Sequence, residues 1–291
     1  MHHLHNIRAQ SAPLLICLLI VGTLQASVGQ AELADPTKRA LYLSETLPNQ
    51  TLKERLQSCA LGDFYPTDFS IAHRGAPLGY PEHSREGYVA AAEQGAGVIE
   101  CDVTFTQDLA LVCRHSQCDL ATTTNILQTP LAAKCSKPFR PANGQQPASA
   151  TCCTTDISLA EFKTLCARPD QSNKKAKTVA QYLAPLRSPV VSEPLACGTL
   201  MTHAQSIELI DAVGRKFTPE LKRPMVDMPF APGFTQAAYA DKLLAEYRAA
   251  GIDPSRVYPQ SFNPDDIWHW VKNHPDFADQ AVWLDARGRR P

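Results

Sequence analysis

The sequence has no excess of charge of either sign and no second long hydrophobic run after the one near its N-terminus. Its 291 residues include 28 basic and 29 acidic side chains. This balance argues against a general nucleic-acid-binding protein, which needs a basic face. A hydrophobic content of 44%, a charged content of 20% and a mean hydropathy of -0.22 exclude a disordered chain, a collagen-like fibre and a polytopic membrane protein.

Two motif classes are also absent. No GxGxxG run follows the first expected strand, which argues against a doubly wound dinucleotide-binding fold. No CxxC pair occurs beside a histidine group, and the only close cysteines are the adjacent Cys152 and Cys153, so a cysteine-based zinc site is not expected. The 23 prolines against 14 glycines indicate many stiff loops.

The N-terminus has the pattern of a targeting segment. Arg8 is the only charged residue before the apolar residues 14–21, and small residues follow up to Ala31. This run is too short to span a bilayer comfortably, so residues 1–31 are predicted to be a secretory signal peptide. We therefore expect the mature chain to be periplasmic or secreted, without stable membrane insertion and with its oligomeric state open.

Cysteine usage supports the same prediction. Nine of the ten cysteines remain after removal of residues 1–31, many for a cytosolic enzyme but ordinary in an oxidising compartment. The odd number requires at least one thiol that is free or paired between chains. Six cysteines lie within residues 116–200, which we expect to form a disulfide-tied insertion with one short helix over residues 158–166.

Strand and helix patterns alternate through the rest of the chain, which predicts a parallel sheet with helices outside. The polar residues at strand ends favour a (β/α)8 TIM barrel. The predicted organisation is an N-terminal extension over 32–68 and a barrel over 69–291, with the insertion after the third strand. Only six strands are recognisable, so we expect a C-terminally truncated barrel without its last two strands. The expected strands are 69–73, 97–105, 109–115, 218–222, 256–262 and 281–284, and the expected helices are 51–59, 84–94, 204–213, 235–250 and 264–272.

Glu100 and Asp102 lie two residues apart in an apolar strand and therefore share one face, the interior face of a barrel. Two close carboxylates repel each other unless a positive charge lies between them, and a divalent cation supplies it. Ligands that are all oxygen favour Ca²⁺ or Mg²⁺ over zinc. An exposed strand edge with solvated charges is the less favoured alternative. Cys101 would face the outer helices as a buried thiol.

Histidines close two of the expected strands. His73, followed by Arg74, ends the first strand, and His115 ends the third. Together with a cation they suit cleavage of a phosphate ester, one imidazole removing a proton and the other protonating the leaving oxygen. Glu220 and Lys222 would share the inward face of a later strand, although this spacing alone is a weak signal.

The ordered motifs in this chain resemble the glycerophosphodiester phosphodiesterase family, in particular exported bacterial members with a cysteine-bearing insertion. The resemblance covers about residues 69–284. It implies a TIM barrel that uses one divalent cation, Ca²⁺ or Mg²⁺, to hydrolyse glycerophosphodiesters to glycerol 3-phosphate and an alcohol. The motifs are His73-Arg74-Gly75-Ala76, Pro81-Glu82-His83-Ser84, Ile99-Glu100-Cys101-Asp102-Val103, His115, Glu220-Leu221-Lys222 and Gln260-Ser261-Phe262.

The resemblance also implies a role for each residue. Glu100, Asp102 and Glu220 would be the metal ligands, and His73 and His115 the general acid and base, with their assignment open. Arg74 and Lys222 would hold phosphate or glycerol oxygens, and Glu82, in the loop near the metal, would contact the metal or orient a ligand, as part of the substrate-binding set.

Three departures from the family pattern are visible, and the most serious is that no counterpart to the Trp-Thr-containing last strands is found. His83-Ser84 replaces the usual Asn-Thr, and Ser116 replaces an Asp after the histidine. The alternatives are a phospholipase D-like enzyme that acts on sphingomyelin or lysophospholipids, and an inactive truncated binding protein.

Overall fold

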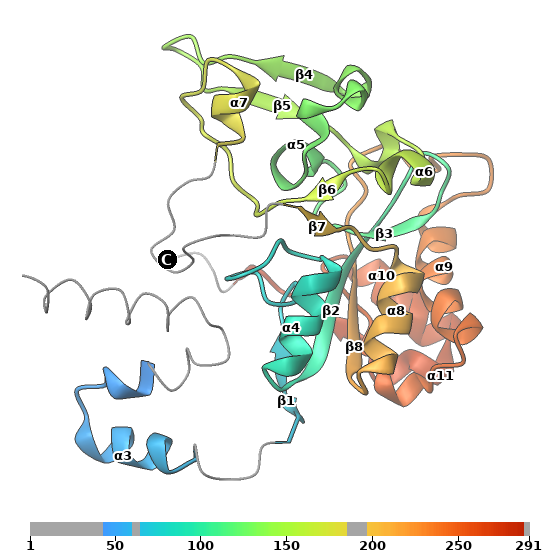
Figure 1. Cartoon of the computed structure of the whole chain (residues 1–291). Helices are drawn as coiled ribbons and strands as arrows, with labels where there is room; N and C mark the ends of the chain where they lie inside the picture. Colours follow the sequence, from blue (N-terminus) through green and yellow to red (C-terminus); the bar gives the residue numbers. More distant parts are fainter. Residues whose placement is uncertain (1–42, 60–64, 185–196, 288–291) are drawn as a thin grey trace, which may run out of the picture.

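A central sheet runs through the computed structural model, which describes residues 43–59, 65–184 and 197–287 (Figure 1). Its parallel strands follow the order β1 (Thr67–Ala72), β2 (Ala96–Phe105), β8 (Lys216–Leu221), β9 (Gln260–Ser261) and β10 (Val282–Trp283). This sheet forms half of a barrel. The predicted signal peptide lies outside the described residues. Within the described ranges, no helix is both long and apolar enough to cross a membrane.

The prediction of a third barrel strand over residues 109–115 is wrong. Strand β3 (Leu111–Cys113) pairs antiparallel with β2, so it is the returning arm of a hairpin. Thr106 N–H donates to Ala110 O at 3.0 Å, and Leu109 has a φ of 65°. Such a short connection can join antiparallel strands, whereas parallel strands need a crossover of a dozen or more residues. The described chain thus has five parallel strands rather than six.

The expected helices are present, and side-chain caps mark their starts. Ser84 caps α4, Thr202 caps α8, Thr235 caps α9 and Asn263 caps α10, each accepting a bond from a backbone N–H in the first turn. The helices of this part of the chain are α3 (Gln50–Ser58), α4 (Arg85–Glu93), α8 (His203–Ala212), α9 (Gln236–Ala249), α10 (Pro264–Asn273) and α11 (Pro275–Ala278).

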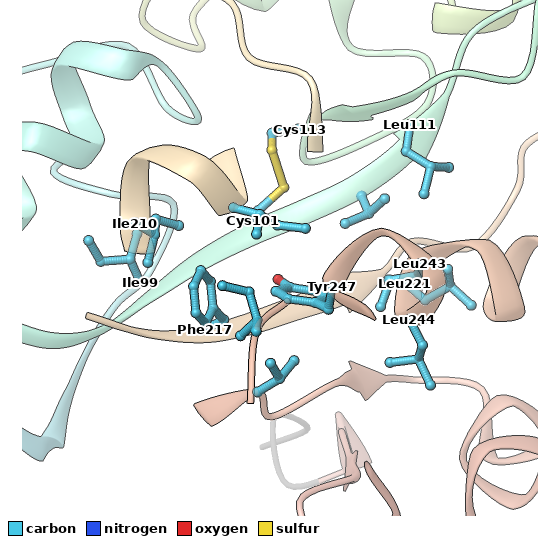
Figure 2. Packing of buried hydrophobic residues seen from close by; sticks show 14 of the residues in the cluster. Ile99, Cys101, Leu111, Cys113, Ile210, Phe217, Leu221, Leu243, Leu244 and Tyr247 are labelled. Atoms are coloured by element: carbon cyan, nitrogen blue, oxygen red, sulfur yellow. A yellow bond between two sulfur atoms is a disulfide. The ribbon is translucent and has the colours of Figure 1, made fainter. Parts of the chain in front are cut away.

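The alternation of strand side chains divides the sheet into an apolar and a polar face. Ile99 and Cys101 of β2, with Phe217 and Leu221 of β8, are buried against Ile210 of α8 and Leu243, Leu244 and Tyr247 of α9 (Figure 2). The predicted carboxylates, Glu100 and Asp102 of β2 and Glu220 of β8, alternate with these apolar residues and so face the other way. Packing of the apolar face on the helices therefore fixes the direction in which the carboxylates point.

One glycine allows β1 and β2 to approach. A Cβ at Gly97 would lie 1.8 Å from the carbonyl oxygen of Thr67. The β1–β2 register shifts between Thr67 and Ile71, and regular pairing resumes from Ile71 onward. A side chain at position 97 would separate the strands.

Residues 116–200 contain more structure than the single short helix expected. They enclose a second apolar core that includes Leu120, Ile126, Phe162 and Tyr182. Their helices are α5 (Leu120–Thr123), α6 (Leu159–Phe162) and α7 (Val179–Tyr182), and their strand pairs are β4 (Lys137–Arg140) with β5 (Ser149–Thr151) and β6 (Cys166–Ala167) with β7 (Gly198–Thr199). Disulfides join Cys118 to Cys153, Cys135 to Cys152 and Cys166 to Cys197.

The prediction of a buried thiol at Cys101 is wrong. Its side chain does face the helices, but it forms a disulfide with Cys113 (Figure 2). Because β3 folds back on β2, the two cysteines lie on neighbouring antiparallel strands. Among the described residues, Cys59 is the free cysteine, and it is exposed.

Candidate active site

Three buried carboxylates lie together on the polar face of the sheet. Glu100 and Asp102 belong to β2, and Asp102 pairs in register with Glu220 of β8. The exposed fractions of these residues are 5%, 1% and 6%. One oxygen from each carboxylate lies within 4.8 Å of the others. The sequence-predicted metal ligands are thus brought together, and an exposed strand edge is excluded for them.

Burial and mutual repulsion make these carboxylates weak acids when no cation is bound. Burial, reinforced by the charge of Asp102, raises the pKa of Glu100 and that of Glu220 to about 7. Burial also raises the pKa of Asp102 to about 6, against the opposing effect of Lys222 and Arg74. Within the described structure, Asp102 Oδ1 is buried without a hydrogen-bond partner. An oxygen-rich, under-compensated cluster of this kind fits a hard divalent cation.

The turn after β1 places two predicted residues beside Glu100. His73 Nε2 lies 3.7 Å from Glu100 Oε2, and its side chain is 69% exposed. The Arg74 backbone N–H donates to Glu100 Oε2 at 2.9 Å. Arg74 has a φ of 62°, which is unfavourable for a residue with a side chain, and its carbonyl accepts a bond from the backbone N–H of His83. The strained turn is thus tied to the loop that follows it.

Glu82 lies between two arginines rather than in the carboxylate cluster. Arg74 Nη1 donates to Glu82 Oε2 at 2.9 Å, and Arg114 Nη2 lies 3.5 Å from Glu82 Oε1. Burial disfavours the Glu82 charge, but the charges of Arg114 and Arg74 outweigh this effect and lower the pKa of Glu82 to about 2. Glu82 therefore holds Arg74 in position while remaining ionised.

Lys222, just after β8, contacts two of the carboxylates, and its charge also acts on His115, just after β3. Lys222 Nζ is 2.6 Å from Glu220 Oε1 and 3.9 Å from Asp102 Oδ1. Burial, followed by the charges of Lys222 and Arg74, lowers the pKa of the half-buried His115 to about 4. His115 is consequently a neutral imidazole near neutral pH.

Three further side chains belong to this site but were not assigned roles from the sequence. His83 is buried, with Nε2 2.8 Å from Asp102 Oδ2 and Nδ1 3.0 Å from the hydroxyl of Tyr88. Gln260 donates from Nε2 to Glu100 Oε1 at 2.9 Å. Arg114, fully buried, also donates to the carbonyl of Glu82. Two of these residues carried a signal in the sequence that could have found them: His83 departs from the family pattern, and Gln260 belongs to the Gln260-Ser261-Phe262 motif.

A cavity of about 710 Å³ adjoins the cluster at the carboxyl ends of β8 and β9. Glu220 and Lys222 line its inner part, and Ser261, Phe262 and Asp266 belong to its wall. A small molecule in this cavity could reach both the carboxylate cluster and the Lys222 ammonium group.

Comparison with known proteins gives a consistent result. Residues 73–279 match the model of the Glycerophosphoryl diester phosphodiesterase family. An extracellular protein from Arthroderma benhamiae is 43% identical over 125 residues, which cover 42% of this chain and 50% of that protein. A Mycobacterium tuberculosis protein named "Probable glycerophosphodiester phosphodiesterase 1" is 47% identical over 49 residues, covering 17% of this chain and 18% of that protein.

A solved structure shows the same fold. The crystal structure of a Silicibacter pomeroyi protein assigned as a glycerophosphoryl diester phosphodiesterase superimposes with a TM-score of 0.52 at 20% identity. The match covers 74% of this chain and 63% of that chain. The chain thus spans half or less of the length of the two curated relatives described above, and under two thirds of this solved relative.

Proposed function

Because the chain belongs to the glycerophosphoryl diester phosphodiesterase family, we propose that it hydrolyses glycerophosphodiesters to glycerol 3-phosphate and an alcohol. The observation that carries this proposal is the convergence of Glu100, Asp102 and Glu220 on one buried point. His73 and Lys222 flank that point, where they could act on a bound phosphodiester. Family membership supports the reaction class.

In this proposal Glu100, Asp102 and Glu220 hold one divalent cation, Ca²⁺ or Mg²⁺. All three supply oxygen ligands, which both of these hard cations prefer. When bound, the cation would neutralise charge on the phosphate and on the oxygens that develop charge in the reaction. Gln260 and His83 hydrogen-bond the outer oxygens of Glu100 and Asp102 and so fix how these carboxylates are oriented.

The two histidines take different roles in this proposal. His115 is kept neutral near neutral pH by its burial and by the cations Lys222 and Arg74, which suits it to accept a proton. His73 Nε2 lies 3.7 Å from Glu100 Oε2, beside the cluster, and His73 would donate a proton to the leaving oxygen. Lys222 and Arg74 would then bind the non-bridging phosphate oxygens.

We also propose that the protein is exported. Four disulfides in the described chain fit an oxidising compartment, and one relative is named as an extracellular protein. Residues 1–31 would supply the signal peptide, by their sequence pattern alone.

The test measures glycerol 3-phosphate release from glycerophosphocholine in Ca²⁺ or Mg²⁺ and then in chelator. We expect cation-dependent release that falls by about 10² to 10⁴ in His73→Ala, and similarly in Glu220→Gln. Glu93→Gln, an exposed carboxylate outside the site, is the matched control and should keep full activity. Choline release from sphingomyelin or lysophosphatidylcholine without glycerol 3-phosphate would favour the phospholipase D-like alternative. Substrate binding by folded protein without any turnover would favour the binding protein.

A further inference from the structure

A second group of metal-ligating side chains lies on the outer helices, apart from the carboxylate cluster. It consists of Asp241 of α9, His269 of α10 and His274 at the junction of α10 and α11. Figure 1 labels these three helices. Both imidazole Nε2 atoms approach one oxygen, Asp241 Oδ1, at 2.6 Å from His269 and 2.7 Å from His274. All three side chains are partly exposed, so solvent ions can reach them.

We propose that Asp241, His269 and His274 form a binding site for a transition-metal dication of the zinc type. Two imidazoles with one carboxylate are a ligand set that zinc accepts, whereas Ca²⁺ and Mg²⁺ prefer oxygen ligands alone. One ligand atom from each side chain lies within 4.8 Å of the others, a separation that one shared ion can bridge. The site is independent of the proposed phosphodiesterase reaction and of its cation.

The second ring nitrogen of each histidine faces a nitrogen donor, whereas around bound zinc this nitrogen usually donates to an oxygen, so each partner must rearrange when zinc binds. His269 Nδ1 lies 3.0 Å from the side-chain amide of Asn273, whose oxygen could accept a hydrogen bond from Nδ1–H after rotation of the amide. His274 Nδ1 lies 2.9 Å from Arg248 Nη2. The amide orientation therefore decides whether His269 presents a free electron pair at Nε2.

Arg248 opposes the metal at His274. A guanidinium only donates, so His274 Nδ1 accepts and its proton sits on Nε2, the atom that would bind the metal. Binding at Nε2 requires that proton to move to Nδ1, and a protonated Nδ1 can no longer accept from Arg248, so Arg248 must release His274. Two bonds from Arg248 to Asp276, at 3.0 and 2.8 Å, would hold the released guanidinium in place. Removal of Arg248 should therefore tighten metal binding, which an ordinary cluster of ion pairs would not predict.

The test uses the full chain in a background that removes other metal-binding groups. Cys59→Ser removes the exposed thiol, and alanine replaces His2, His3 and His5. Excess Ca²⁺ occupies the carboxylate cluster. Zinc affinity is measured by titration calorimetry, and Co²⁺ is then used as a probe because its visible absorption reports nitrogen ligands. We expect one zinc per chain and an increase in the melting temperature, since the metal binds the native state.

The variants then assign the site. We expect Asp241→Asn and His269→Gln each to weaken zinc binding at least tenfold, with Asp265→Asn, an exposed carboxylate of the same helix α10, as the unchanged control. Arg248→Met, which keeps an apolar stem near the ring of Phe277, should bind zinc more tightly. Absence of zinc binding in the calcium-saturated protein would overturn the proposal, as would unchanged affinity in Asp241→Asn. Unchanged affinity in Arg248→Met would contradict the assignment of His274 and with it the three-ligand site.

Discussion

The imidazole of His83 lies with its Nε2 2.8 Å from Asp102 Oδ2, although both side chains are buried. Burial, together with the cations Arg114, Arg74 and Lys222, holds the pKa of His83 well below its usual value, so the ring is neutral. The Tyr88 hydroxyl can donate to Nδ1, which places the remaining ring proton on Nε2, directed at Asp102. His83 thus orients a carboxylate of the candidate metal site without adding charge.

Replacement of His83 by leucine should therefore weaken binding of the divalent cation. Loss of a partner that orients a metal ligand typically costs about 10- to 100-fold in affinity. Calcium titration by calorimetry measures the effect. Tyr88→Phe keeps the His83–Asp102 contact and should cost less than His83→Leu. Equal affinity in His83→Leu and the unsubstituted protein would show that Asp102 needs no such support.

The stability of the metal-free protein should fall as the pH rises from about 6.5 to about 8. Burial raises the pKa of Glu100 and of Glu220 to about 7, far above their values in an unfolded chain, so the native state binds more protons in this window. Stability falls with pH wherever the native state holds the extra protons. His83 and His115, whose pKa values are lowered by burial, act in the opposite direction, but mainly below about pH 6.5, where unfolded histidines are charged.

Thermal unfolding across this pH range in chelator measures the slope. Saturating Ca²⁺ should abolish the fall, because a bound cation compensates the ionised carboxylates. Glu220→Gln should reduce the slope in chelator because it removes one of the two titrating groups. A flat profile in chelator would contradict the raised pKa values.

The sequence was sufficient to predict which face of a strand each side chain occupies, because side chains alternate along a strand. Glu100 and Asp102 could be placed on one face because their neighbours Ile99 and Val103 are apolar, and these neighbours do pack on the helices. The direction of β3 was missed, although the short interval between Phe105 and Leu111 already favoured a hairpin over a parallel crossover.

Other features of the site depend on contacts between distant segments, which a local pattern does not contain. Arg114 approaches Glu82, 32 residues earlier, and Gln260 reaches Glu100 across 160 residues. The disulfide between Cys101 and Cys113 could be assigned only after the hairpin was known, because cysteine spacing does not determine pairing.

Replacement of Glu82 by glutamine should destabilise the fold more than an ordinary surface substitution. The guanidinium of Arg114 is fully buried, and its positive charge is balanced by two carboxylates. Glu82 lies 3.5 Å from its Nη2, and Asp119 lies 3.8 Å from its Nε. Removal of one partner of a buried ion pair typically costs about 3 to 5 kcal/mol. Urea unfolding measures the loss. The double variant Glu82→Gln with Arg114→Met should recover part of it, and an additive loss in the double variant would show that the two residues are not coupled.

Removal of the disulfide by the paired change Cys101→Ala and Cys113→Ala should cost about 3 kcal/mol, the value expected for a closed loop of this size. The two cysteines are separated by 12 residues and lie in the main core. Urea unfolding under oxidising conditions measures the change, with Cys59→Ser, an exposed free cysteine, as the control of unchanged stability. An unchanged midpoint in the paired variant would mean that the bond adds nothing to the packing around it.

Replacement of Gly97 by alanine should be among the most damaging small changes in the chain. The new Cβ would lie 1.8 Å from the Thr67 carbonyl oxygen, and this contact is with backbone that cannot rotate away. Because overpacking in well-packed regions typically costs about 1 to 3 kcal/mol and more where relief is blocked, we expect about 3 kcal/mol or more from urea unfolding. Gly144→Ala is the comparison: its Cβ meets no atom within 4 Å, but its φ of 89° adds backbone strain, so it should lose only about 1 to 2 kcal/mol. If the two variants lost the same stability, the cost at Gly97 would come from general glycine strain and not from the close approach of β1 and β2.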